Sequence, residues 1–240
     1  MKSPEFTIII PAWNEHEVIE DAVYAVEKFF KGKDFELLIV NDGSSDNTAK
    51  IVNLLRRKYK NLRLISHSKN IGMGAALSTG FAHAKGKVVI NMDADLTHPL
   101  SKVSKMLSAI HEGYDVAICS RYVPGGGMKD VPLWRQAISV VCNKIFRLLF
   151  WSGIHDMTSG YRAYRIDAAR KINLQSKGFE APLESTIRSI KLGLKVREIP
   201  ITLGLREKGN SKFNYKKAAK TYIPMLFRLF FYRWFARIKK

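Results

Sequence analysis

The first half of the chain alternates short apolar segments with helical patterns, and this order restricts the possible folds more than any other feature. The apolar segments are rich in β-branched residues and bounded by polar residues or glycine, which is typical of buried strands. They cover residues 6–10, 36–40, 62–66, 87–91 and 115–119. Because helical patterns separate them, we predict an α/β fold with a doubly wound, mostly parallel sheet and helices on both faces.

The helices are predicted from their apolar spacing and their first residues. One apolar stripe runs from Val18 to Phe30, Asp46 is a predicted N-cap of the next helix, and Pro99 is predicted to begin a helix that ends near Ile110. The second half is less regular. There we predict helices at 132–151 and 182–192, strands within 156–165 and 195–201, and a last helix that begins near Tyr215.

Two carboxylates follow the strand predicted at 87–91. Asp93 and Asp95 are separated by one residue, at the point where this strand ends. In open α/β sheets, ligands bind outside the carboxyl ends of the strands. Carboxylate oxygens are the ligands that Mg²⁺ prefers, and they leave coordination positions for phosphate oxygens. A polar turn is the simpler alternative. His98 is the only histidine that we place near this predicted site.

Three further polar segments are predicted at the same edge of the sheet. Residues 11–15 follow the first strand, 41–46 follow the second, and 70–74 precede a helix at 75–84. Backbone N–H groups at such helix starts can bind phosphate. Each segment alone is compatible with an ordinary turn, but together with Asp93 and Asp95 they predict one nucleotide site.

The motifs resemble those of the family 2 inverting glycosyltransferases, which have the GT-A fold. The matching segments are Ile8 to Glu15, Val40 to Thr48 and Asp93 to Asp95. Segments 120–122, 158–162 and 206–212 resemble, more narrowly, the dolichyl-phosphate β-mannosyltransferases of that family. The resemblance covers about residues 6–213. It implies a GT-A domain at 1–213, followed at 214–240 by an amphipathic helix that contacts a membrane interface.

The resemblance also implies a donor site. Its nucleoside-binding residues would be Pro11, Trp13, Glu15, Val40 and Asp42, with Asp93 and Ala94 along the ribose and diphosphate. Asp95 would hold Mg²⁺ or Mn²⁺ and act in catalysis. Thr97 occupies the position of a second, weaker metal ligand.

Basic residues complete the implied site. Arg121, Arg206 and Lys212 would bind the phosphates of the sugar nucleotide, since a planar guanidinium binds phosphate with two hydrogen bonds. The acceptor phosphate would contact Arg121, Arg135 and Ser159. Arg121 is therefore the second predicted catalytic residue. A surface ion pair is the alternative for Arg121 and Arg206.

The implied activity is transfer of mannose from GDP-mannose to dolichyl or another polyprenyl phosphate, with inversion to a β-mannosyl phosphate. No further carboxylate stands out as a general base. A phosphate acceptor needs none, because its second pKa is about 6 and it is largely dianionic at neutral pH. UDP-glucose or another sugar nucleotide, used with the same acceptor, is the alternative that the residues leave open.

The chain has a formal net charge of +19, from 40 basic and 21 acidic residues, which predicts an anionic partner. Residues 205–240 hold eleven Lys and Arg against one acidic residue, and so carry +10 of this charge. A basic nucleic-acid-binding module is the alternative of another class. It is not favoured, because the basic aromatic residues lie on a terminal helix rather than on a sheet or groove. We expect no nucleic-acid partner.

A polyprenyl acceptor requires contact with a bilayer, and two segments are candidates for that contact. In the last helix an apolar stripe of Phe227, Phe231, Trp234, Phe235 and Ile238 lies opposite Arg233, Arg237 and Lys240. Residues 134–151 likewise combine apolar positions with Arg135, Lys144 and Arg147. Both patterns are typical of helices in a membrane interface. For either helix, packing on the core is the alternative, and the last helix can also dock on a small membrane-embedded partner subunit.

No apolar run reaches the roughly 20 residues that span a bilayer, and no signal peptide is visible. The two cysteines, Cys119 and Cys142, form no zinc motif and suit a reducing compartment. We therefore expect a peripheral protein on the cytoplasmic face of a membrane, bound through its C-terminal helix.

Overall fold

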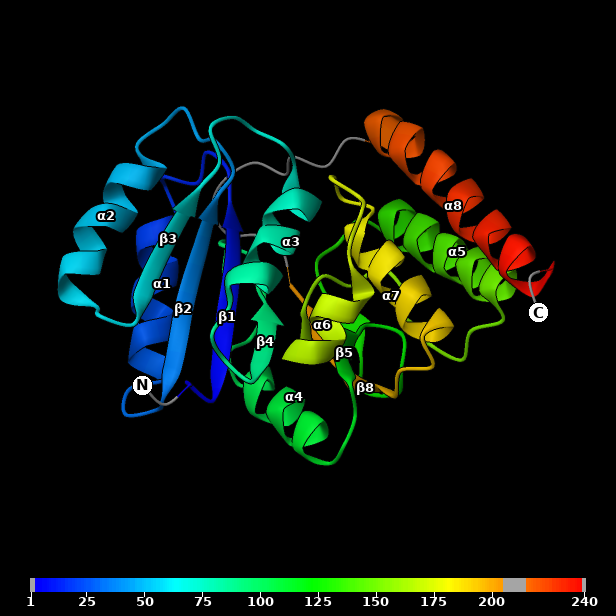
Figure 1. Cartoon of the computed structure of the whole chain (residues 1–240), viewed down its shortest axis with the longest axis horizontal. Helices are drawn as coiled ribbons and strands as arrows, with labels where there is room; N and C mark the ends of the chain where they lie inside the picture. The colour runs from blue at the N-terminus through cyan, green and yellow to red at the C-terminus, as the bar shows by residue number, and fades with distance from the viewer. Residues whose placement is uncertain (1–2, 205–214, 239–240) are drawn as a thin grey trace.

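The computed structural model describes residues 3–204 and 215–238 of the 240-residue chain. Its main sheet has seven strands in the order β3-β2-β1-β4-β7-β5-β8 (Figure 1). The strands are β1 (Phe6–Ala12), β2 (Phe35–Asn41), β3 (Leu62–Ser66), β4 (Val88–Asn91), β5 (Val116–Ser120), β7 (Arg162–Arg165) and β8 (Val196–Pro200). A separate parallel pair joins β6 (Gly127–Met128) to β9 (Thr202–Leu203).

Helices separate most of the strands, as predicted. They are α1 (Ile19–Phe29), α2 (Thr48–Lys58), α3 (Met73–His83), α4 (Lys102–His111), α5 (Leu133–Phe150), α6 (Ile166–Ile172), α7 (Ala181–Lys191) and α8 (Tyr215–Ile238). Within the described residues, no helix is both long enough and apolar enough to cross a bilayer.

The sheet is mostly parallel, which confirms the predicted topology. β1 to β4 run parallel to one another where they pair, and β5 runs parallel to β8. β7 is antiparallel to both of its neighbours, β4 and β5. Because parallel strands end at the same edge of a sheet, the segments that follow β1, β2, β3 and β4 all lie at that edge.

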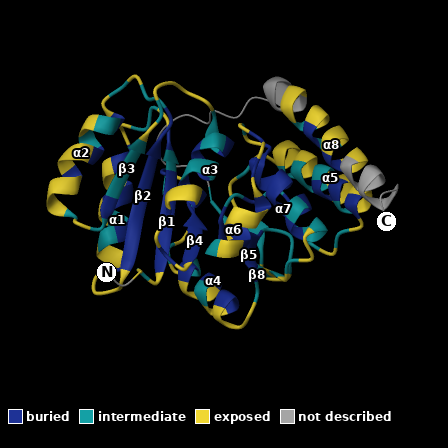
Figure 2. Ribbon diagram, in the orientation of Figure 1, coloured by how far each residue is buried: buried dark blue, intermediate teal, exposed yellow. Residues whose placement is uncertain are grey.

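Alternate side chains of each central strand fill the two faces of the sheet. Ile8 and Ile10 of β1 belong to the apolar cluster that includes α1, α2 and α4, whereas Ile9 belongs to the cluster that includes α3 and α6. All three are fully buried, since strand side chains point alternately to opposite faces. Helices therefore cover both faces, and the near-continuous apolar runs suit a parallel sheet buried on both sides (Figure 2).

A third apolar cluster joins three helices beside the sheet. It contains Phe146 and Phe150 of α5, Leu183 and Ile187 of α7, and Met225 and Leu229 of α8. Arg228 of α8 also forms an ion pair with the buried carboxylate of Glu184, with 3.0 Å between Nη2 and Oε1. One side of the last helix therefore packs on the rest of the chain, next to α5 and α7 (Figure 1).

Two helices begin later than predicted. The segment after Pro99 first forms a turn, in which Lys102 N–H donates to the Pro99 carbonyl at 3.0 Å, and α4 begins at Lys102. α2 begins at Thr48 rather than after an N-cap at Asp46. Asp46 still pairs with a backbone N–H group at the start of this helix, because its carboxylate accepts a 2.9 Å hydrogen bond from the Thr48 N–H.

Candidate active site

Hydrogen bonds hold the loops after β1 and β2 together. Asn14 Oδ1 accepts from the Ser45 N–H at 2.9 Å, and the Asn14 N–H donates to Ser44 Oγ at 3.0 Å. The Glu15 N–H donates to Thr48 Oγ1 at 2.9 Å. The two segments predicted to bind the nucleoside thus form one unit. Within it, Pro11 and Val40 are register partners on adjacent strands, and Trp13 is exposed.

Asp42 organises the loop that follows β3. Its buried carboxylate accepts hydrogen bonds from His67 Nδ1 at 2.7 Å, from Ile71 N–H at 3.0 Å and from Gly72 N–H at 2.7 Å. The loop passes so close that a Cβ on Gly43 would lie 2.2 Å from the Lys69 carbonyl carbon. Asp42 therefore fixes the conformation of the loop after β3 at this edge of the sheet. Its predicted contact with the base stays a prediction.

His67 is a residue of this edge that the sequence analysis missed. A carboxylate only accepts hydrogen bonds, so the Nδ1 of His67 carries the hydrogen that it shares with Asp42, and Nε2 pairs with Thr79 Oγ1 at 2.9 Å. The imidazole thereby links the loop after β2 to helix α3. Its position directly after β3, at the carboxyl end of a parallel strand, was the available signal.

The two carboxylates after β4 differ in exposure and in contacts. The Asp93 side chain is 54% exposed, whereas Asp95 Oδ1 accepts hydrogen bonds from the N–H of Thr97 at 3.1 Å and from its hydroxyl at 2.8 Å. The backbone turns sharply between them and Thr97, with a positive φ of 56° at Leu96. Ala94 is buried beneath the loop.

The Thr97 side chain contacts the predicted metal-binding carboxylate. Its hydroxyl donates to Asp95 Oδ1 at 2.8 Å, and its role as a second, weaker metal ligand stays a prediction. A threonine two residues after an aspartate can form this local turn, because a short side chain hydrogen-bonds nearby backbone and carboxylate groups. In this arrangement Thr97 orients Asp95.

His98 lies behind the two carboxylates. Its buried ring stacks on Tyr161 with 4.5 Å between ring centroids, and Tyr161 donates to the Pro99 carbonyl at 3.0 Å. His98 Nδ1 lies 3.9 Å from Asp93 Oδ2, too far for a hydrogen bond. His98 therefore supports the loop from inside the fold.

Arg121, a predicted phosphate ligand, pairs with a buried carboxylate in the structure. Its Nε and Nη2 donate to the two carboxylate oxygens of Asp156 at 2.7 and 2.8 Å, and Nη2 also donates to Thr158 Oγ1 at 3.0 Å. Asp156 is fully buried. Burial alone would raise the pKa of Asp156, but the hydrogen bonds and charge of Arg121 outweigh it and hold that pKa below its ordinary value. The bidentate face of Arg121 thus pairs with Asp156 in the structure, and its predicted contact with phosphate stays a prediction.

The other predicted acceptor residues, Ser159 and Arg135, differ in exposure. Ser159 is buried beside the Arg121–Asp156 pair, and its N–H donates to Asp156 Oδ1 at 3.0 Å. Arg135 is exposed near the start of α5, where its guanidinium lies 5.1 Å from the ring centroid of Trp134. Arg206 and Lys212 lie outside the described residues, so their predicted contacts stay predictions.

The carboxylate oxygens at this edge of the sheet fit a divalent metal that is bound together with a phosphorylated ligand. Asp93 and Asp95 offer hard oxygen atoms. No third His, Cys, Asp or Glu joins them into a closed metal site within the described parts of the chain. An ion held here would take its remaining ligands from water and from the diphosphate, which is the usual arrangement for Mg²⁺.

Helix α5 connects this edge to an exposed apolar surface. On its inner side, Ser139 Oγ lies 2.6 Å from the Tyr122 hydroxyl, and Asn143 Nδ2 donates to Thr158 Oγ1 at 3.1 Å. On its outer side, the exposed apolar residues are Leu133, Trp134, Ile138, Val141, Ile145, Leu148 and Leu149. Helix α5 therefore packs on the core through its inner side, and its outer side stays exposed.

The outer side of α8 is also apolar. Ile223, Phe227, Phe230 and Phe231 are exposed, opposite the buried Met225 and Leu229. We call the exposed apolar residues of α5 and α8 the apolar surface. The side chains of Trp234, Phe235 and Ile238, and of Arg233, Arg237 and Lys240, lie outside the described residues.

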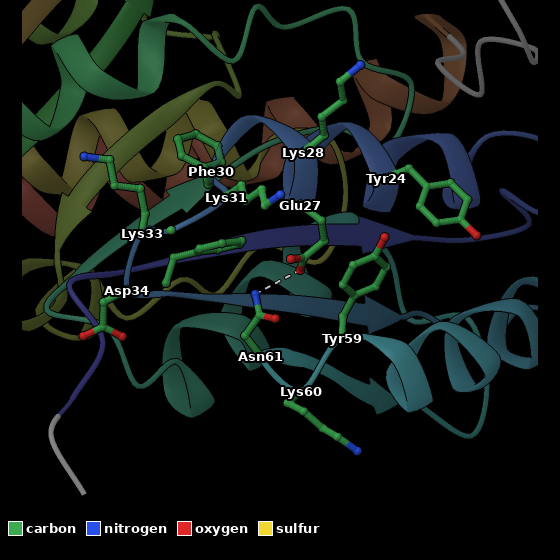
Figure 3. Close-up of a pocket in the computed structure, with 12 residues that line it drawn as sticks. Tyr24, Glu27, Lys28, Phe30, Lys31, Lys33, Asp34, Tyr59, Lys60 and Asn61 are labelled. Carbon is green, nitrogen blue, oxygen red and sulfur yellow. Dashed lines mark hydrogen bonds between the residues drawn. The ribbon is translucent and has the colours of Figure 1, made fainter.

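A hollow of about 740 Å³ lies at the opposite end of the sheet, where β2 and β3 begin (Figure 3). Phe30, Phe35 and Tyr59 line it, and Asn61 Nδ2 donates to Glu27 Oε1 at 2.9 Å within it. The ammonium groups of the surrounding lysines point away from one another and do not converge on one ligand (Figure 3). None of the predicted site residues lines this hollow, so the edge described above is the better candidate.

Comparisons of sequence place the chain among known enzymes. A model of glycosyl transferase family 2 matches residues 7–172. Polyprenol monophosphomannose synthase of Mycolicibacterium smegmatis is 37% identical over 214 residues, which cover 86% of this chain and 80% of that protein. Dolichol-phosphate mannosyltransferase of Pyrococcus furiosus is 34% identical over 225 residues, or 93% of this chain. The matched region spans 63% of the length of the Pyrococcus protein.

Solved structures agree on the fold. Glucosyl-3-phosphoglycerate synthase from Mycobacterium tuberculosis, in complex with Mn²⁺, UDP-glucose and phosphoglyceric acid, superposes with a TM-score of 0.70 at 19% identity. The match covers 95% of this chain and 80% of that one. This confirms the predicted GT-A fold. The chain therefore belongs to glycosyl transferase family 2, and it is a glycosyltransferase.

Proposed function

We propose that this enzyme transfers mannose from GDP-mannose to dolichyl or another polyprenyl phosphate, with inversion, to give a β-mannosyl phosphate and GDP. The observation that carries the proposal is the position of α5. Its inner side hydrogen-bonds to Tyr122 and Thr158 at the candidate active site, and its outer side is exposed and apolar. A transferase that acts on a lipid phosphate needs its active site beside a surface that contacts lipid. The names of the two sequence relatives support the same acceptor class.

The reaction needs little acid–base chemistry from the protein. A phosphate oxygen of the acceptor forms a bond to the anomeric carbon as the bond from that carbon to the GDP diphosphate breaks. Because the acceptor phosphate is already largely dianionic, no side chain has to remove a proton from it. Attack from the face opposite the leaving group inverts the anomeric carbon.

The protein must instead position two anions and stabilise the leaving diphosphate. Asp93 and Asp95 would hold Mg²⁺ or Mn²⁺, which when bound neutralises charge on the diphosphate. Thr97 orients Asp95 for this task. The paired Arg121 and Asp156 fix the loop that carries Ser159 at the acceptor side. Arg206 and Lys212 are proposed to contact the donor phosphates.

Membrane contact is proposed through the apolar surface on α5 and α8. Phe227 and Phe231 stack with 6.1 Å between ring centroids and are both exposed. Aromatic side chains next to basic residues favour the headgroup region of a bilayer. We propose a peripheral enzyme on the cytoplasmic face, where sugar nucleotides are available. A small membrane-embedded partner subunit on α8 stays a prediction.

A transfer assay on liposomes tests this function. Liposomes that contain dolichyl phosphate are incubated with the enzyme and Mg²⁺ or Mn²⁺, and receive GDP-mannose or UDP-glucose in separate reactions. We expect a lipid-linked mannose product from GDP-mannose, and its loss with excess chelator. If product forms only from UDP-glucose, then UDP-glucose replaces GDP-mannose as the donor in this proposal. If neither sugar nucleotide gives product, the proposed acceptor is rejected.

A further inference from the structure

A second hollow lies at the C-terminal end of α5, away from the donor site. It has a volume of about 450 Å³ and is lined by Lys144, Arg147, Leu148, Trp151, Ser152 and Gly153. No acidic residue lines it, and α5 itself contains none. The hollow therefore combines two cationic side chains with two large apolar ones, and no carboxylate among its lining residues neutralises the cations.

The arginine in this hollow has an unsatisfied donor. Arg147 Nε is buried and has no hydrogen-bond partner among the described residues. Buried donors of charged groups are nearly always paired, because leaving one unpaired costs energy. Because Nε itself is shielded from solvent, an anion in the hollow would bind the remaining N–H groups of the Arg147 guanidinium together with the Lys144 ammonium. A guanidinium next to an ammonium group is a combination that suits phosphate oxygens.

The apolar side chains of the hollow are held outward. Leu148 is 75% exposed and Trp151 is 76% exposed. Trp151 ends the helix with a left-handed backbone at φ 44°, which is unfavourable for a bulky residue. Hydrogen bonds from the Trp151 and Ser152 N–H groups to the Leu148 and Arg147 carbonyls hold this ending in place. The indole thus stands at the rim of a cationic hollow.

We propose that this hollow binds the phosphate headgroup of an anionic phospholipid, while Trp151 and Leu148 enter the bilayer interface. The inference rests on the proposed membrane contact of α5. An apolar rim beside two cations matches the boundary between headgroups and acyl chains. The acceptor phosphate is a second source of the same chemistry, but it must reach the loop of Arg121 and Asp156, which the inner side of α5 contacts. We therefore assign the hollow to bulk lipid.

Liposome flotation without donor or acceptor tests the assignment. Vesicles of phosphatidylcholine are compared with an equimolar mixture of phosphatidylcholine and phosphatidylglycerol. We expect the double variant Lys144→Gln with Arg147→Gln to bind the anionic vesicles roughly thirtyfold more weakly than wild type, since each basic residue near such a surface contributes about fivefold. Binding to phosphatidylcholine alone should change little.

A matched control removes the same charge elsewhere. Lys50→Gln with Arg57→Gln removes an exposed Lys and an exposed Arg from α2. This helix lies beside β3, the first strand in the sheet order, on the opposite side of the molecule from α5 (Figure 1). We expect this control to keep nearly all anionic binding. An equal loss in the control, or full anionic binding by the α5 double variant, would overturn the proposal. Release of the wild-type protein from anionic vesicles by millimolar inorganic phosphate would also overturn it, because that result would indicate a site for free phosphate.

Two further measurements keep the result interpretable. The exposed Lys144 is also changed singly to Glu, which should weaken anionic binding even if the double variant folds poorly. Circular dichroism checks the fold of each variant. Because the flotation assay contains neither sugar nucleotide nor polyprenyl phosphate, its outcome is independent of transfer, and a failure of the proposed reaction appears only in the transfer assay.

Discussion

At the residue scale, the metal-binding carboxylate is the most direct test of the candidate active site. Replacing Asp95 by Asn keeps the shape and the contact with Thr97 but removes the charge that would bind the ion. We expect Asp95→Asn to lower transfer by more than about a hundredfold, with unchanged circular dichroism. The measurement is kcat together with metal-dependent GDP binding. Wild-type turnover in this variant would show that Asp95 holds no metal.

The pairing of Arg121 leads to a second prediction at this scale. Lysine keeps the charge but cannot donate two parallel hydrogen bonds to Asp156 and a third to Thr158. We expect Arg121→Lys to lower kcat by about tenfold or more, because the loop that carries Ser159 loses its anchor. Steady-state kinetics at saturating acceptor measure this. Unchanged kcat and KM would mean that the pair does not position the acceptor side.

Asp156 gives a pH-dependent prediction. Its folded-state pKa lies below the unfolded value of about 4. Its contribution to stability is therefore complete above pH about 4 and is lost as the pH falls through the lower, folded-state pKa. We expect Asp156→Asn to cost about 3–5 kcal/mol at pH 7, since it leaves Arg121 buried without a counter-charge. Urea unfolding at several pH values should show a shallower acid dependence for the variant, and an unchanged dependence would contradict the assignment.

At the scale of single elements, α8 is attached to α7 by Arg228 as well as by apolar contacts. The Arg228 guanidinium is half-exposed but reaches the buried carboxylate of Glu184, which also accepts from Arg188 Nε at 2.7 Å. We expect Arg228→Met to cost about 1 kcal/mol or less, because the guanidinium is half-exposed and Glu184 keeps Arg188 as its partner. We nevertheless expect it to speed hydrogen exchange in α8. Arg188→Met, within α7, is the control and should leave α8 exchange nearly unchanged. Equal exchange in both variants would mean that the other contacts of α8 hold it without Arg228.

Elements were more predictable from the sequence than contacts between elements. The parallel strands have continuous apolar runs, and each is followed by a polar segment, so both the sheet and its functional edge could be predicted. The pair between Arg121 and Asp156 joins residues 35 positions apart, and the contact of His67 with Asp42 joins residues 25 apart. No local pattern encodes such pairs. They depend on how the loops meet once the sheet has formed.

The amphipathic pattern of α5 shows the same limit. Apolar residues at helical spacing predict that one side of a helix is buried, but not whether protein or lipid covers it. In the structure the inner side of α5 packs through Phe146 and Phe150, while Ile138 and Val141 are exposed. The choice between core and membrane therefore required the positions of α7 and α8, which the sequence alone did not indicate.

At the scale of the whole molecule, the structure changes how membrane binding should be tested. Removing residues 222–240 is the most direct experiment on a terminal helix in a membrane interface. In the folded chain, however, Met225 and Leu229 fill the cluster shared with α5 and α7. Truncation would therefore expose a core and confuse loss of folding with loss of lipid contact. Substitutions confined to one side of α8 separate these two effects.

The last prediction uses that division of α8 into two sides. Phe227 and Phe231 are exposed on the outer side, whereas Met225 and Leu229 are buried on the inner side. We expect Phe227→Ser with Phe231→Ser to keep the thermal midpoint but to lose most liposome binding and most transfer to long-chain acceptor. Burying an aromatic side chain in an apolar phase contributes about 1.5–3 kcal/mol, so the two together should weaken binding at least about a hundredfold.

The matched inner variant, Met225→Ser with Leu229→Ser, should show the opposite result. It removes buried apolar groups, so we expect a lower free energy of unfolding by about 4–8 kcal/mol, at 2–4 kcal/mol for each large-to-small change, while the outer aromatic residues are retained. Flotation and thermal unfolding of both variants measure the two effects separately. If the outer variant still floats with liposomes as wild type does, α8 does not contact the bilayer, and the exposed side of α5 becomes the remaining described surface for that contact.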